Sequence, residues 1–176
     1  MRKFTMFAAL LLAASAMPAM AMTPGQVNCP LALAPAGLGA ATTDALLDFD
    51  NADALDPKVE AALSSLVKKC MAREQVANDQ LDDYTNYVMS TLVSTELKAR
   101  LTGQSISTQV LDEAFDLGPG RRNPQSKELD KQAYVEIVRK MKAGGIDINT
   151  LTDAKLNDIS TYVATTSTMY RLAATH

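Results

Sequence analysis

Apolar residues recur every three or four positions along most of this chain, and clusters of glycine and proline interrupt the pattern. The clearest stripe follows Asp56-Pro57, a capping residue and a proline suited to the first helical position. Its members are Val59, Ala62, Leu63, Leu66, Val67, Cys70 and Met71. No stretch shows the sustained two-residue alternation of a half-buried strand. The spacing predicts an all-α fold of about five helices, in a single compact bundle or an orthogonal array.

Four more helices are predicted at about 78–103, 107–117, 126–143 and from Thr152 onward, with a short helical piece at 44–49. Glycine and proline clusters end them, and Ser94-Thr95 is a possible division within the first of the four. The stripe of the helix at 126–143 is expected to face inward, and it consists of Leu129, Ala133, Tyr134, Ile137, Val138 and Met141. The threonine-rich run at 165–168 is a poor helix former, so the end of the last helix is left open.

The N-terminal residues have the features of a signal peptide. Arg2 and Lys3 form a positive start, an apolar centre follows at 7–14, and Ala19-Met20-Ala21 fits the small-residue rule for cleavage after Ala21. A second possible cut lies after Ala16. We therefore expect residues 1–21 to be removed and the mature protein to be soluble, in the periplasm or secreted, and not membrane-spanning.

Residues 22–43 hold several prolines and glycines among alanine and leucine. Proline and glycine at this density favour a loop over a helix or a strand. The predicted organisation is a signal peptide at 1–21, an irregular N-terminal arm at 22–43 and a helical domain at 44–176.

Cys29 and Cys70 are the only cysteines. In an oxidising compartment such a pair predicts a disulfide, here one that ties the arm to a helix. A metal pair or a catalytic redox site is disfavoured because C-x-x-C is absent and the only histidine is His176.

Charge is unevenly distributed along the chain. The net charge is −3, and loss of Arg2 and Lys3 with the signal peptide makes it −5. A net negative chain without tryptophan is a poor candidate for binding nucleic acid. Acidic residues prevail at 44–60 and basic residues at 121–142, as solvated faces or as a surface that steers a charged partner. Arg121-Arg122, between helix-breaking clusters, is the candidate partner contact.

Asp48, Asp50 and Asp53 suggest a calcium site only weakly. Counted from Asp48, an EF-hand loop would need an oxygen ligand at Ala52, glycine at Asp53 and glutamate at Val59. An acidic linker that leads into a helix N-terminus is the favoured interpretation.

Residues 151–163 (Leu-Thr-Asp-Ala-Lys-Leu-Asn-Asp-Ile-Ser-Thr-Tyr-Val) resemble the C-terminal helix of class I cytochromes c. That family attaches haem through C-x-x-C-H, which this sequence lacks, and no internal histidine could serve as an axial ligand. We interpret the stretch as a capped amphipathic helix and expect no cofactor.

Common hydrolase machinery would need His176, so we expect no enzyme of that kind and assign no catalytic residue. The leading hypothesis is a bacterial cell-envelope protein that binds another envelope or secreted protein, as an inhibitor, immunity factor, chaperone or assembly subunit. The first alternative is a module that binds a small ligand, an ion or a cell-wall fragment between helices. The second is a carboxylate-dependent cell-wall hydrolase that uses Asp82-Asp83, Asp112-Glu113 or Glu136.

Overall fold

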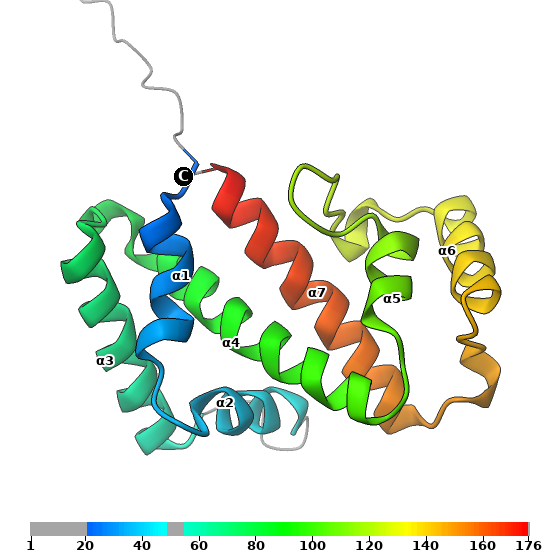
Figure 1. The fold of residues 1–176 in the computed structure, drawn as a ribbon, viewed down its shortest axis with the longest axis horizontal. Coiled ribbons are helices and arrows are strands. Elements are labelled where there is room, and N and C mark those ends of the chain that lie inside the picture. The colour runs from blue at the N-terminus through cyan, green and yellow to red at the C-terminus, as the bar shows by residue number, and fades with distance from the viewer. Residues whose placement is uncertain (1–20, 49–54, 176) are drawn as a thin grey trace, which may run out of the picture.

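The computed structural model describes residues 21–48 and 55–175 of the chain. Within them it contains seven α-helices, three short 3-10 turns and no strand (Figure 1). The helices are α1 (Pro24–Leu33), α2 (Leu38–Leu47), α3 (Pro57–Glu74), α4 (Leu81–Gly103), α5 (Thr108–Phe115), α6 (Lys131–Ala143) and α7 (Asp153–Thr175). The 3-10 turns are η1 (Asn78–Gln80), η2 (Ser126–Glu128) and η3 (Ile148–Thr150). The all-α prediction is confirmed, whereas the predicted number of about five helices is wrong.

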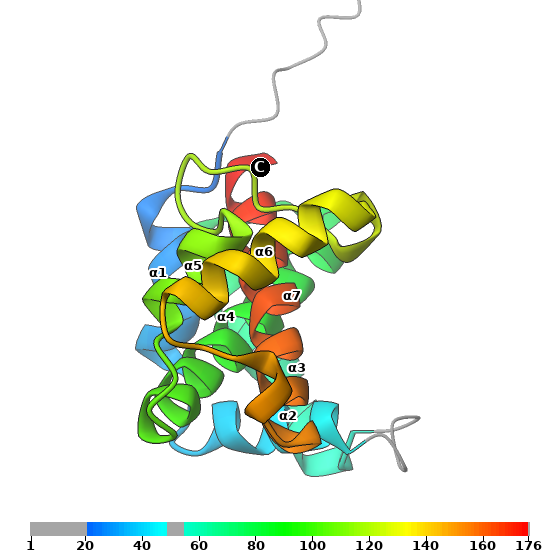
Figure 2. The same cartoon turned by 90° about the vertical axis from the view of Figure 1, so that its right-hand side faces the viewer.

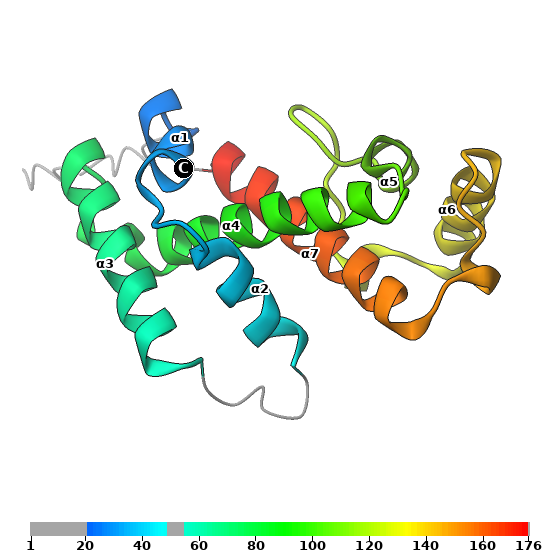
Figure 3. The same ribbon diagram turned by 60° about the horizontal axis from the view of Figure 1, so that its bottom comes forward.

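The two longest helices, α4 and α7, cross at the centre of the molecule and pack against each other (Figures 1 and 3). Helices α1, α2 and α3 all contact α4. Helix α1 meets its first part at Tyr84 and Tyr87, whereas α2 lies along its later part, where Asp44 pairs with Arg100. Helix α5 packs against α4, α6 and α7, and α6 is the outermost helix on that side (Figure 2). The central pair therefore joins two groups of shorter helices.

Each group of helices has its own hydrophobic core, and α4 contributes to both. In the first core, Cys29, Leu66 and Val88 bring α1, α3 and α4 together. In the second, Leu101 and Leu111 join α4 and α5, and residues of α6 and α7 complete it. Besides the core residues, α4 and α7 bury small polar side chains, namely Ser90, Thr91, Ser94, Thr166 and Ser167. Their size allows the two helix axes to approach closely.

The prediction of an irregular arm at 22–43 is wrong, because the segment forms α1 and α2. Thr23 caps α1: its hydroxyl accepts from the N–H of Gln26, and its own N–H donates to the Gln26 side chain. Pro24 occupies the first turn, where a missing N–H costs nothing. Gly37, with φ of 79°, provides the left-handed residue that turns the chain into α2. Pro24 and Gly37 therefore mark the starts of two helices.

The predicted disulfide is present and joins Cys29 of α1 to Cys70 of α3. The two Cα atoms lie 5.7 Å apart, and both residues are buried in the first core. Two tyrosines of α4 hold the same helix: Tyr84 donates to the carbonyl of Gln26 and Tyr87 to that of Val27, each at 3.0 Å. A covalent bond and two hydrogen bonds thus fasten α1 to the body.

The structure answers two questions that the sequence left open, and one helix start differs from the prediction. Helix α4 runs without a break through Ser94, and α7 continues through the threonine run to Thr175. The hydroxyls of Thr165 and Thr168 donate to carbonyls of the preceding turn, which satisfies these polar groups inside the helix. Helix α6 begins only after η2, because Asp130 caps it.

None of the helices in the described part of the chain is long and apolar enough to cross a lipid bilayer.

Candidate functional site

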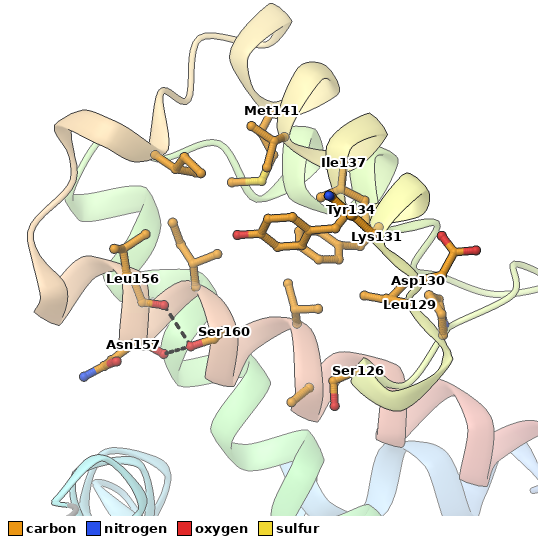
Figure 4. A pocket seen from close by; sticks show the side chains of 17 residues that line it. Ser126, Leu129, Asp130, Lys131, Tyr134, Ile137, Met141, Leu156, Asn157 and Ser160 are labelled. Carbon is orange, nitrogen blue, oxygen red and sulfur yellow. Dashed lines mark hydrogen bonds between the residues drawn. The ribbon is translucent and has the colours of Figure 1, made fainter.

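A cavity of about 600 Å³ lies between α6 and α7 (Figure 4). Most of its lining side chains are apolar, and they come from α5, α6, α7 and the two turns that flank α6. The lining comprises Phe115, Pro124, Ser126, Leu129, Asp130, Lys131, Tyr134, Ile137, Val138, Met141, Ile148, Leu156, Asn157, Ile159, Ser160, Val163 and Ala164. A concave, mostly apolar site of this size with a few polar groups is typical of a small-molecule binding site.

Helix α6 packs against α5. The space between α6 and α7 is left open and forms the cavity, whose walls are side chains of both helices. Ile137 and Met141 are the buried residues of α6. At the end of the helix, Gly144 lies directly against Val110 of α5, where a Cβ atom would overlap the valine methyl groups. This contact sets how closely α5 and α6 approach.

Tyr134 was predicted to face the core, but 55% of it is exposed. Its ring extends across the cavity between α6 and α7 (Figure 4). The next residue, Val135, is 60% exposed and does not line the cavity. The apolar face of α6 is thus wider than the surface that neighbouring helices cover. Val135, next to the predicted stripe, is the sequence signal that part of this face has no helix packed on it.

Six of the 17 side chains that line the cavity are polar, namely Ser126, Asp130, Lys131, Tyr134, Asn157 and Ser160. The hydroxyl of Ser160 donates to the carbonyls of Leu156 and Asn157, within its own helix. The carboxylate of Asp130 accepts from the N–H of Ala133 at 2.7 Å as the cap of α6. Lys131 is exposed and supplies a positive charge at this wall. The Ser160 hydroxyl and the Asp130 carboxylate are thus engaged within the protein, and apolar side chains make up most of the wall.

A second cavity, of about 430 Å³, lies between α5 and α6. It shares Phe115, Pro124, Leu129 and Ile137 with the first cavity. Its remaining lining is mainly charged and includes Glu113, Asp116, Arg122, Glu136 and Lys140. Helix α6 is therefore flanked by an apolar cavity on one side and a charged one on the other.

The structure gives Arg121 and Arg122 different surroundings. The guanidinium of Arg121 donates to the carbonyl of Asp112 at 3.1 Å, near the C-terminal end of α5, where a positive charge is favourable. Arg122 is exposed and lines the charged cavity. Their role as a partner contact stays a prediction.

The loop that carries these arginines is held by Asn123, which is only 5% exposed. Its side chain accepts from the N–H of Gly118 at 2.8 Å and donates to the carbonyls of Gly118 and Arg121, each at 2.9 Å. Ser167 of α7 donates to the carbonyl of Asn123 at 2.6 Å. A loop with this many hydrogen bonds presents Arg122 from a defined position.

Asp112 and Tyr162 form a hydrogen-bonded pair between α5 and α7. The tyrosine hydroxyl donates to the carboxylate at 2.9 Å. Burial raises the pKa of Asp112, and the hydrogen bond from Tyr162 partly opposes that rise. Burial and the adjacent carboxylate raise the pKa of Tyr162. The pair links the helices on either side of the second core.

The acidic residues proposed as a weak calcium site fall partly outside the described residues. Asp48 follows the last residue of α2, whereas Asp50 and Asp53 lie outside. Across 21–48 and 55–175, no three His, Cys, Asp or Glu side chains gather as a metal site would require.

No family model, curated protein or solved structure matches the chain.

Proposed function

We propose that this protein is exported through a signal peptide at residues 1–21 and that its mature domain is a binding module without catalytic activity. The observation that carries the proposal is the cavity of about 600 Å³ between α6 and α7. The Cys29–Cys70 disulfide supports export, because such bonds persist mainly in oxidising compartments.

The ligand that suits this cavity is a single-chain amphiphile such as a fatty acid. Leu156, Val163 and Ile137 supply walls that cannot hydrogen-bond, so a sugar or a nucleotide would lose its contacts with water without replacement. An aliphatic chain has no such cost and gains about 0.8 kcal/mol for each methylene group that it buries. Lys131, at the cavity wall, is placed to pair with a carboxylate at the end of the chain.

Displacement of a fluorescent apolar probe by fatty acids of increasing chain length tests this function. Affinity should rise with each added methylene and level off once the chain fills the cavity. Leu156→Trp, which fills the cavity, should weaken binding by on the order of tenfold, the equivalent of about two lost methylene contacts. Leu31→Trp, on the exposed surface of α1, is the matched control and should bind as the native protein does. Binding that ignores chain length, or that both variants weaken equally, would contradict the proposal.

A second candidate is binding to another exported protein through the outer side of α6. The exposed Tyr134 favours it, because tyrosine is one of the residues that most often anchor protein interfaces. Val135 beside it adds exposed apolar surface. The basic residues at 121–142 would suit a partner with an acidic surface. Affinity capture from envelope extract should recover a partner with the native protein and lose it with Val135→Asp. Leu81→Asp, an exposed position at the start of α4, is the control. Failure to recover a reproducible partner would count against this candidate.

A further inference from the structure

Met22, two residues before α1, is attached to the fold through both its backbone and its side chain. Its backbone N–H donates to the carbonyl of Ala173 at 3.0 Å. Its side chain packs against the first core, as do Met169 and Leu172 of α7. The segment that enters α1 lies beside the end of α7 in both views (Figures 1 and 2). The two segments thus meet at a backbone hydrogen bond.

Helix α7 ends at Thr175, so the carbonyl of Ala173 is among the last four, which have no partner within the helix. These carbonyls carry the negative end of the helix dipole, where a positive charge is stabilising. In the uncleaved chain the donor is a neutral amide. A charged donor at the same place would satisfy the same carbonyl and would also interact with the dipole.

We propose that hydrolysis of the Ala21–Met22 bond places the new α-ammonium group of Met22 on the carbonyl end of α7, where it stabilises the mature fold. Water is the co-reactant: the carboxylate leaves with residue 21, and the amine stays on Met22 and takes up a proton. This inference rests on the proposed signal peptide.

The geometry favours cleavage after Ala21 over cleavage after Ala16. Ala21 is exposed, and Met22 after it packs on the core. A cut after Ala16 would put the new amine on Met17 and leave the nitrogen of Met22 a neutral amide. Only the cut after Ala21 therefore turns the donor to the Ala173 carbonyl into an ammonium group.

Within 21–48 and 55–175, the titratable groups near this site come from α3, α4 and α7. Tyr84 of α4 lines a small cavity together with Met22, and burial raises the pKa of its hydroxyl to about 12, so it is neutral below that pH. Glu74 of α3 lies against Gly25 in the first turn of α1, and its negative charge favours an ammonium group nearby. On α7, Arg171 is paired with Glu128 at 2.8 Å.

The test compares three oxidised proteins, which begin at Met22, Ala21 and Met17 and are released from a cleavable fusion. At pH 7 the form that begins at Met22 should unfold about 1–4 °C higher than the other two. The docked amine should have a pKa above the unfolded value of about 8, so its contribution is full below pH 8 and is lost as the pH rises through the folded pKa. At pH 10 the three melting temperatures should therefore converge. Met22→Leu in the first form keeps the amine and should retain the difference.

Equal melting temperatures at pH 7, or a difference that persists at pH 10, would overturn the docked amine. N-terminal sequencing of the exported protein is a separate measurement. A start at Met22 supports the proposed cut, whereas a start at Met17 overturns it. An uncleaved chain would refute the signal peptide itself, and the melting comparison distinguishes that failure from failure of the docking.

Discussion

The hydroxyl of Tyr84 donates to the carbonyl of Gln26, the carbonyl that an α-helix would pair with the N–H of residue 30. That residue is Pro30, which has no N–H. A tyrosine of α4 thus replaces the hydrogen bond that proline removes from α1. Because Tyr84 provides this hydrogen bond, Pro30 can lie buried inside α1 without leaving the carbonyl of Gln26 unpaired.

Tyr84→Phe should therefore destabilise the protein by about 1–3 kcal/mol, because it leaves the carbonyl of Gln26 without a partner. Urea unfolding with the disulfide intact measures the effect. Tyr134→Phe, at an exposed position, is the matched control and should change the free energy of unfolding little. An equal loss in both variants would show that the Tyr84 hydroxyl has no special role.

Loss of the disulfide should destabilise the fold substantially. It closes a loop with a sequence separation of 41, for which the chain-entropy model gives about 4 kcal/mol. Cys29→Ser/Cys70→Ser should lower the free energy of unfolding by about that amount, as measured by urea unfolding. Dithiothreitol should lower the stability of the native protein and leave the double variant unchanged. A native protein insensitive to the reductant would contradict the assignment.

Gly144→Ala should destabilise the contact between α5 and α6 by about 1–3 kcal/mol, because the added methyl group would overlap Val110. Val110→Ala should relieve this overlap, so the double variant should be more stable than the sum of the two single effects indicates. A double-mutant cycle in urea measures the coupling. Gly103→Ala, at a position with no atom near the added methyl group and without a positive φ, controls for the general effect of replacing glycine. Strict additivity would show that the two positions do not touch.

Asn123→Asp should loosen the arginine loop. The carboxylate can still accept from the N–H of Gly118, but it cannot donate to the carbonyls of Gly118 and Arg121. We expect a loss of about 1–3 kcal/mol for these unsatisfied groups and faster amide hydrogen exchange at residues 118–122. Gln125→Glu, a nearby change of the same chemical kind, should leave the exchange of that loop as it is. Unchanged exchange in Asn123→Asp would contradict this role of the side chain.

The Asp112–Tyr162 pair predicts a pH dependence of stability. Because the folded pKa of Asp112 is raised, its contribution to stability is greatest below the unfolded pKa and is lost as the pH rises through the folded value. Asp112→Asn keeps an oxygen for Tyr162 without the charge. Its stability relative to the native protein should increase as the pH rises from the acid range toward neutrality. Urea midpoints across that range test the sign, and a difference that stays constant with pH would refute it.

Sequence patterns were reliable where a local signal and burial agree. The stripe after Asp56 became α3, and the helix predicted from 107 begins directly after Ser107, whose side chain caps α5. Cys29 and Cys70 form the expected bond. Prediction failed at residues 22–43 because proline and glycine have opposite meanings inside and at the start of a helix. Which meaning applies depends on partners elsewhere, such as the Tyr84 hydroxyl for the carbonyl before Pro30.

The candidate site shows the same division. The apolar stripe of the helix at 126–143 is legible in the sequence, but whether Tyr134 packs in a core or faces a cavity depends on what lies opposite. The contact of Gly144 with Val110 fixes α6 against α5. The part of the apolar face of α6 that α5 does not cover lines the cavity beside α7. By itself the sequence determined the helical class, most helix starts and the disulfide, because these follow from short-range periodicity, capping chemistry and two cysteines. The tertiary structure decided the two-core arrangement, the helical conformation of α1 despite its internal proline, and the cavity. Each of these depends on contacts between residues far apart in the chain.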